Sequence, residues 1–195
     1  MKEVSVDTIA REIARMSIEA ACDLPKDVEA ALRAAAEQEE SAFGKYAMDK
    51  VCRNFEIARE QGVPMCQDTG MAIVFAEVGQ DVHIVGGSFE DAVNAGIAQG
   101  YADGYLRKST VIDPLLDRRN AGDNTPAIIY ARLVPGDSLT LTLMPKGAGS
   151  ENMSRLKMLK PAEGLAGVKD FVLQAVVEAG GNPCPPTIVG IGIGG

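Results

Sequence analysis

The segment Pro64–Gly70 divides the chain into two parts with different hydrophobic patterns. It reads Pro-Met-Cys-Gln-Asp-Thr-Gly, and its proline and glycine end a helix and permit a sharp turn. Before this segment, apolar residues recur at helical spacing, and after it β-branched and apolar residues gather in short strand-like runs. We therefore expect one α+β domain over residues 1–195, with N-terminal helices over about 1–63 and a mixed sheet with packed helices over about 64–195.

The first part predicts three helices. Their expected ranges are Val4–Ala21, Pro25–Glu40 and Ser41–Gln61. Ser5 or Asp7 is a suitable N-cap for the first helix, because a short polar side chain accepts a backbone N–H there. Gly62 is the expected C-cap of the third helix, since glycine adopts the left-handed conformation that ends helices.

The second part predicts strands that alternate with two longer helices. The expected strands are Met71–Val78, His83–Val85, Ala127–Val134 and Ser138–Met144. The turn Val134–Asp137 predicts that the last two strands form a hairpin. One helix begins after Ser88 with an apolar row at Val93, Ile97, Tyr101 and Tyr105, and another covers Leu165–Ala179. We expect Lys146–Ser150 to be a loop and Ile188–Gly195 to be strand-like.

Charge and composition restrict the kind of partner and compartment. The net charge of −8 argues against a nucleic-acid surface or an anionic membrane. No apolar stretch approaches the ~20 residues of a membrane span, and no secretory leader is present, so we expect a cytoplasmic protein. A small anionic substrate would need a local cationic pocket. The four cysteines are expected to stay reduced in such a protein, which favours metal binding or burial over disulfides.

Two of the cysteines stand in rigid, irregular settings. Cys66 follows Pro64, and Cys184 lies in Asn-Pro-Cys-Pro-Pro, which indicates that one metal site is shared by the two. Their spacing matches no zinc or ferredoxin signature, so burial without a metal stays open on spacing alone. Cys22 and Cys52 belong to helices and are interpreted as small core residues. His83, the only histidine, is given no role, which leaves a cysteine-nucleophile enzyme without a base.

Four segments in order resemble a known family. Cys66–Gly70 (CQDTG), Leu106–Ser109 (LRKS), Pro145–Asn152 (PKGAGSEN) and the NPCPP run before Thr187–Gly195 are similar to the alpha subunit of class I iron–sulfur fumarate hydratases and of the closely similar L-tartrate dehydratases. The resemblance covers nearly the whole chain. It implies a 4Fe-4S cluster held by three cysteines, two of them Cys66 and Cys184, with one iron open to act as a Lewis acid.

The resemblance also implies the other residues of the site. Asp68 would be the catalytic base, although an aspartate there also caps a turn. Arg107, Gln67 and Gly149 would bind the dicarboxylate substrate, Gly149 through a nest of backbone N–H groups. Lys108 is expected to point to solvent.

The implied activity is the reversible hydration of fumarate to malate, a tricarboxylic acid cycle reaction. L-tartrate dehydration is the alternative on the same scaffold, and a non-catalytic assembly or regulatory module is an alternative of another class. A beta subunit would complete the pocket in an oligomer. The strand-like run that ends on two glycines indicates a domain cut short, and the resemblance places the third cysteine ligand beyond it. We expect this chain alone to be inactive.

Overall fold

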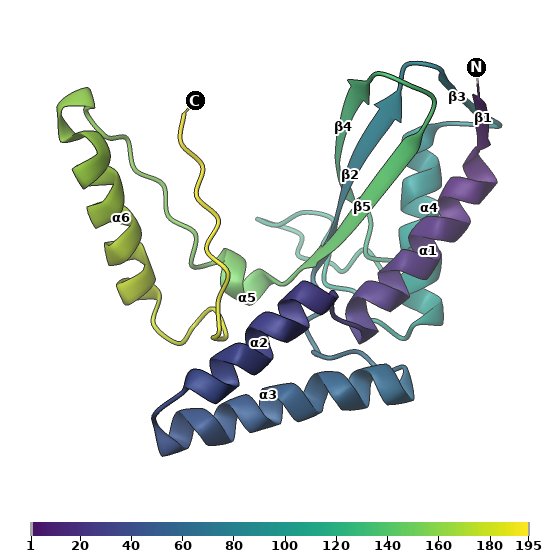
Figure 1. Ribbon diagram of the computed structural model, residues 1–195. Coiled ribbons are helices and arrows are strands. Elements are labelled where there is room, and N and C mark those ends of the chain that lie inside the picture. The colour runs from purple at the N-terminus through teal and green to yellow at the C-terminus, as the bar shows by residue number, and fades with distance from the viewer. Residues whose placement is uncertain (1, 195) are drawn as a thin grey trace. The chain divides into compact units, whose positions relative to one another are not determined.

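The computed structural model describes residues 2–194 (Figure 1). It divides into two compact units, Met1–Lys146 and Gly147–Gly195, each with its own secondary structure. Helices and mixed sheets are both present, which confirms the α+β class. Within residues 2–194, no helix is both long and apolar enough to cross a membrane.

The first unit contains four helices and five strands in the described part of the chain. In order they are β1 (Lys2–Ser5), α1 (Val6–Cys22), α2 (Lys26–Gln38), α3 (Ala42–Gln61), β2 (Met71–Gly79), β3 (Val82–Val85), α4 (Phe89–Asp103), β4 (Ile128–Val134) and β5 (Leu139–Lys146). The predicted helices are confirmed to within a few residues at each end. Serines cap three of them: the side-chain oxygens of Ser5, Ser41 and Ser88 each accept a backbone N–H three residues on. Gly62, at φ 63°, ends α3 as expected.

The main sheet has the strand order β4-β2-β5, so the predicted hairpin is wrong. β2 lies between β4 and β5, parallel to β4 and antiparallel to β5. The turn after Val134 instead crosses the end of β2. There the N–H groups of Gly79 and Gln80 donate to the carbonyls of Ser138 and Val134, both at 2.9 Å. The turn residues predicted a reversal of the chain, and it occurs. They carried no information on whether another strand, here β2, lies between the two strands that the turn connects.

A second, two-stranded sheet joins the N-terminus to the middle of the unit. β1 pairs in parallel with β3, Lys2 opposite Val82 and Ser5 opposite Val85. The sequence predicted β3 but assigned Val4 and Ser5 to the first helix. β1 has four residues and depends on a partner far along the chain, so its own sequence carries no sufficient signal.

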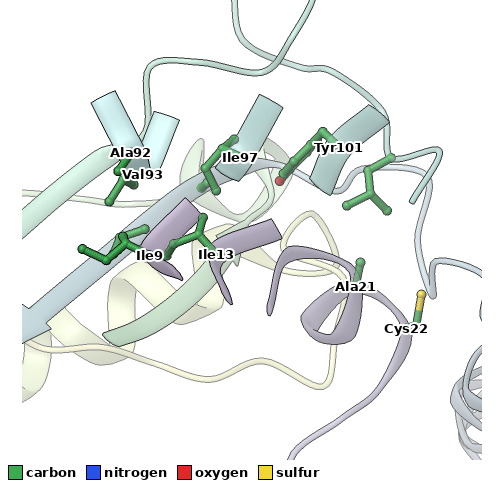
Figure 2. Close-up of a cluster of buried hydrophobic side chains, with 11 residues drawn as sticks. Ile9, Ile13, Ala21, Cys22, Ala92, Val93, Ile97 and Tyr101 are labelled. Atoms are coloured by element: carbon green, nitrogen blue, oxygen red, sulfur yellow. The ribbon is translucent and has the colours of Figure 1, made fainter. Parts of the chain in front are cut away.

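The core of the unit lies between α1, α4 and the inner face of the main sheet. Ile9 and Ile13 of α1 meet Val93, Ile97 and Tyr101 of α4 (Figure 2). The leucines of β5 that alternate with threonines pack against this cluster, as their period-2 pattern predicts.

Glycines let the two core helices approach closely. A Cβ at Gly100 would lie 2.7 Å from the carbonyl oxygen of Ala14, so a larger residue would push α4 away from α1. Tyr105 does not continue the predicted apolar row. α4 ends at Asp103, and Tyr105 stands exposed beyond it with φ 52°.

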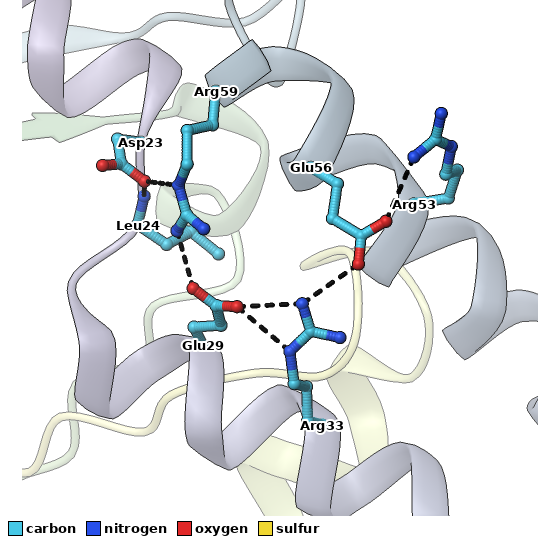
Figure 3. A network of polar contacts seen from close by, with 7 residues as sticks. All are labelled: Asp23, Leu24, Glu29, Arg33, Arg53, Glu56 and Arg59. Atoms are coloured by element: carbon cyan, nitrogen blue, oxygen red, sulfur yellow. Dashed lines mark hydrogen bonds and ion pairs between the residues drawn. The ribbon is translucent and has the colours of Figure 1, made fainter.

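The pair α2 and α3 is joined by ion pairs (Figure 3). Arg59 of α3 donates to Asp23 and to Glu29, both at 2.6 Å. Arg33 of α2 bridges Glu29 and Glu56 at 2.9 and 3.0 Å. α2 has no fully buried residue, and its half-buried apolar side chains are accompanied by these ion pairs to α3.

The second unit contains α5 (Ala148–Glu151), a 3-10 turn (Pro161–Glu163) and α6 (Gly164–Ala179). The last predicted helix is confirmed. The predicted loop Lys146–Ser150 is wrong in part, because residues 148–151 form one helical turn. The expected strand is wrong for Ile188–Gly194, where the described residues pair with no other strand, and Gly195 lies outside the described residues. Apolar residues at strand-like spacing form a strand only where a partner offers backbone hydrogen bonds.

Candidate functional site

The Cys66–Gly70 turn is anchored at its start by two helices. The N–H of Met65 donates to the carbonyl of Ala21 at the end of α1, at 2.9 Å. The side-chain amide of Asn54 on α3 donates to the carbonyl of Met65 at 2.8 Å. The chain therefore enters the turn from a fixed position, while Cys66 and Gln67 are exposed.

Hydrogen bonds within the turn orient its side chains. The N–H of Asp68 lies 3.4 Å from the Cys66 sulfur, in the position of a donor. The Oδ1 of Asp68 accepts the N–H of Gly70 at 3.2 Å. Asp68 thus caps the turn, as one reading of the sequence predicted. The cap also holds the half-buried carboxylate in one orientation, which is compatible with a catalytic role.

The end of the turn is tied to α4 and to Leu106–Ser109, the Arg107 segment. The hydroxyl of Thr69 donates to the carbonyl of Arg107 at 2.8 Å. The Tyr101 hydroxyl donates to the carbonyls of Thr69 and Gly70 at 3.0 and 3.2 Å. Burial, with a smaller contribution from the Asp68 charge, raises the pKa of Tyr101 to about 12, so the phenol keeps the proton it donates. The structure therefore brings together two of the four motif segments.

Asn124 completes this connection, and sequence reasoning missed it. Its side chain is fully buried. Its Nδ2 donates to the carbonyl of Gly70 at 3.1 Å, and its Oδ1 accepts the N–H groups of Ser109 at 2.7 Å and Thr110 at 3.2 Å. The available signal was its setting in Asp-Asn-Thr-Pro, because asparagine is one of the few residues that tolerate the positive φ found here, 66°.

The Arg107 segment is irregular rather than helical. Leu106 is buried, Arg107 is exposed and Lys108 is half-buried. The expectation that Lys108 points to solvent is therefore met only in part. The carbonyl of Lys108 accepts a hydrogen bond from the Asn120 side-chain amide at 2.8 Å, which fixes the backbone at this residue.

Ser109, the last residue of the same segment, has a buried hydroxyl without a hydrogen-bond partner among the described residues. Its backbone N–H is satisfied by Asn124. The hydroxyl is thus an uncompensated polar group beside the candidate site.

The four cysteines are all free, and they differ in access. Cys66 and Cys184 are exposed, Cys52 is half-buried in α3, and Cys22 is buried at the end of α1. Burial raises the pKa of the Cys22 thiol and so disfavours the thiolate that binds metals. The two exposed cysteines in irregular backbone fit iron–sulfur ligation, whereas Cys22 does not. Among residues 2–194, no three His, Cys, Asp or Glu side chains gather closely enough to hold a metal ion.

The remaining residues considered in the sequence analysis belong to segments other than the Cys66–Gly70 turn and the Arg107 segment. Cys184 belongs to the second unit, with φ 57°, and Gly149 lies exposed within α5 of that unit. His83 is exposed on β3. A shallow hollow is lined by Lys2, Asp81, Gly136 and Asp137. These residues lie near the C-terminal end of β2, whereas the turn precedes its N-terminal end, so the hollow is not part of this candidate site.

Comparisons with known proteins support the family indicated by the motifs. The family model described as Fumarate hydratase (Fumerase) matches residues 10–195. A protein of Methanocaldococcus jannaschii named "Putative L(+)-tartrate dehydratase subunit alpha" is 42% identical over 186 residues, which is 91% of this chain. The L(+)-tartrate dehydratase subunit alpha of Escherichia coli strain K12 is 26% identical over 194 residues, which is 98% of this chain. The chain spans 64% of the length of each of these relatives.

Proposed function

Because the chain belongs to the fumarate hydratase (Fumerase) family, we propose that it is the alpha part of an iron–sulfur hydro-lyase acting on a four-carbon 2-hydroxy dicarboxylate. The observation that carries the proposal is the pairing of the Cys66–Gly70 turn with the Arg107 segment through Thr69 and Asn124. This pairing ties the backbone that carries Cys66 and Asp68 to the backbone that carries Arg107. A thiol, a carboxylate and a guanidinium are groups that the proposed reaction would use.

Arg107 is proposed to bind one substrate carboxylate. A dianion entering a protein of net charge −8 needs a fixed cation, and the arginine fork offers two parallel hydrogen bonds to a carboxylate. Arg107 is exposed, and Thr69 fixes the position of its backbone carbonyl. The exposed amide of Gln67 and the backbone of Gly149 are proposed as further substrate contacts.

Asp68 is proposed to exchange the carbon-bound proton beside a substrate carboxylate. Elimination of water needs a base at that carbon, placed within hydrogen-bond reach of the proton. The N–H of Gly70 holds the Asp68 carboxylate in place, which limits the reorientation needed before proton transfer.

Cys66 and Cys184 are proposed to hold the cluster. When bound, a 4Fe-4S cluster with an open iron supplies a Lewis acid for the departing hydroxyl. The chain contributes two exposed, free thiols. Reduced cysteines also fit a cytoplasmic protein, where we expect the enzyme to act.

Two substrates are candidates. One is malate, which is interconverted with fumarate, and the other is L-tartrate. The family description favours fumarate, and the names of the relatives favour tartrate. Both substrates carry two carboxylates and a 2-hydroxyl, so an arginine clamp suits either. The designation of the relatives as alpha subunits supports a beta subunit as partner of this chain, within an oligomer.

The test is to co-express the chain with a complementary beta subunit, assemble the cluster anaerobically and assay malate and L-tartrate separately. Formation of fumarate identifies the first activity, and formation of oxaloacetate from tartrate identifies the second. A preparation with intact cluster absorption that converts neither substrate contradicts the proposal and favours a non-catalytic assembly or regulatory module.

A further inference from the structure

One side chain links the two motif segments of the candidate site, although it belongs to neither. Asn124 contacts Gly70 at the end of the turn and both Ser109 and Thr110 just after Arg107. Residues 70 and 109 are distant in sequence, so this amide joins segments that the local chain does not hold together.

The contacts of Asn124 use both ends of its amide. The NH2 group donates to the carbonyl of Gly70, and the oxygen accepts two backbone N–H groups and the hydroxyl of Thr110, the last at 3.2 Å. An aspartate would keep the acceptor but lose the donor. A glycine would adopt the positive φ at low cost, but it would remove all of these hydrogen bonds to Gly70, Ser109 and Thr110.

The setting shows that the contacts are not incidental. Asn124 is fully buried, and its φ of 66° is a conformation that most residues avoid. A buried amide in low dielectric forms stronger hydrogen bonds and is costly to leave unpaired. The fold thus places, at a backbone conformation that asparagine tolerates, a polar side chain that is hydrogen-bonded at both ends of its amide between the two segments.

We propose that Asn124 is a positioning residue that fixes the Arg107 segment relative to the Cys66–Gly70 turn. It acts through Ser109 and Thr110 on one side and through Gly70 on the other, without touching substrate. The consequence for catalysis rests on the proposed function, since it requires Arg107 to bind substrate, but the mechanical link between the segments does not.

Amide hydrogen exchange on the purified chain tests the link without substrate. In Asn124→Gly, the N–H groups of Ser109 and Thr110 should exchange at least about tenfold faster, and the Cys66–Gly70 turn should also lose protection. In Asn124→Asp, Ser109 and Thr110 should stay protected while the turn alone loosens, because a carboxylate oxygen faces the Gly70 carbonyl.

Asn94→Ala is the matched control. The half-buried Asn94 amide also accepts a backbone N–H from a loop, that of Ala127 at 2.8 Å, and its side chain has no hydrogen bond to either motif segment within residues 2–194. Its loss should leave exchange in both segments unchanged. Unchanged protection of Ser109 and Thr110 in Asn124→Gly would overturn the link, and so would equal loosening of both segments in Asn94→Ala.

A double-mutant cycle in the two-subunit enzyme tests the consequence for catalysis. Asn124→Gly should lower kcat/KM by about tenfold to a hundredfold, the effect of a small misplacement of a binding group. If Asn124 acts through Arg107, Asn124→Gly should lower kcat/KM several-fold less in the Arg107→Ala background than in the wild type. A purely structural role predicts the same fold reduction in both backgrounds, and that result would overturn the positioning role. A wild-type enzyme inactive on both substrates would refute the proposed function, and the exchange result would still decide the link.

Discussion

At the scale of single residues, the polar groups of the candidate site divide into those held by the fold and those left exposed. Asp68, Tyr101 and Asn124 are fixed by hydrogen bonds to backbone groups. Cys66 and Arg107 are exposed on the framework that these residues build. This division fits a site in which the supporting residues set geometry and the exposed ones meet a ligand.

Replacing Arg107 by alanine should lower kcat/KM by roughly 10- to 150-fold in the two-subunit enzyme, since charged hydrogen bonds contribute about 1.5 to 3 kcal/mol. Arg107→Lys should recover only part of the loss, because a point charge replaces the planar fork. Steady-state kinetics on malate and on tartrate measure the effect. An alanine variant within about twofold of wild type on both substrates would remove Arg107 from the site.

Replacing Ser109 by alanine should leave the free energy of unfolding unchanged or raise it by up to about 1 kcal/mol, because an unpaired buried hydroxyl is removed. Thr110→Val is the contrast. It removes a hydroxyl that does donate to Asn124, so it should destabilise by about 1 kcal/mol. Urea unfolding of both variants provides the measurement. A clear loss of stability in Ser109→Ala would mean that the hydroxyl has a partner after all.

At the scale of elements, two kinds of helix pairing occur in the first unit. α1 and α4 meet through apolar residues and a close approach at Gly100. α2 and α3 are joined by the charges of Glu29, Arg33, Glu56 and Arg59, and Arg59 also pairs with Asp23 at the end of α1 (Figure 3). The first pairing should be insensitive to pH and salt, whereas the second depends on ionised carboxylates.

Acidification should loosen α2 from α3 before it affects α1 and α4. The hydrogen bond from Arg59, followed by that from Arg33, lowers the pKa of Glu29 below its ordinary value of 4.5. A lowered folded-state pKa contributes stability that is present above pH 4.5 and is lost as pH falls through the lowered value.

Hydrogen exchange of α2 at neutral pH and below pH 4.5 measures this loosening. Glu29→Gln should show weaker protection at neutral pH and a flatter pH response. An α2 whose protection is independent of both pH and salt would contradict the ion-pair attachment.

At the scale of the whole molecule, the proposed cluster ligands belong to different units. Cys66 lies in the turn of the first unit, and Cys184 lies in the second unit between prolines. The proposed cluster requires both thiols as ligands in the assembled enzyme, so loss of either one should prevent metal binding.

Cys66→Ser and Cys184→Ser should each abolish stable cluster binding in the reconstituted two-subunit enzyme, measured as iron content and visible absorption. Cys52→Ser is the control, because the half-buried Cys52 lies within α3 and should leave the cluster intact. An experimental structure of the holoenzyme with the sulfurs of Cys66 and Cys184 more than roughly 10 Å apart would refute a shared cluster.

The features that the sequence predicted well depend on neighbours along the chain. Helix ends followed from Ser5, Ser88 and Gly62, because a cap bonds to backbone only a few residues away. The period-2 alternation of leucine and threonine in β5 matches its half-buried leucines and exposed threonines. The family followed from short motifs such as Cys66–Gly70, and the family model matches residues 10–195.

The features that only the tertiary structure decided depend on distant partners. Alternation along β5 specifies which of its side chains face inward, but not that β2 lies between β4 and β5. β1 exists because β3 offers it backbone hydrogen bonds. Asn124 became recognisable only once folding placed Gly70 and Ser109 at either end of its amide. Local sequence thus determines the conformations that the backbone can adopt at low cost, whereas the pairing of distant polar groups is settled when burial removes the water that would otherwise satisfy them.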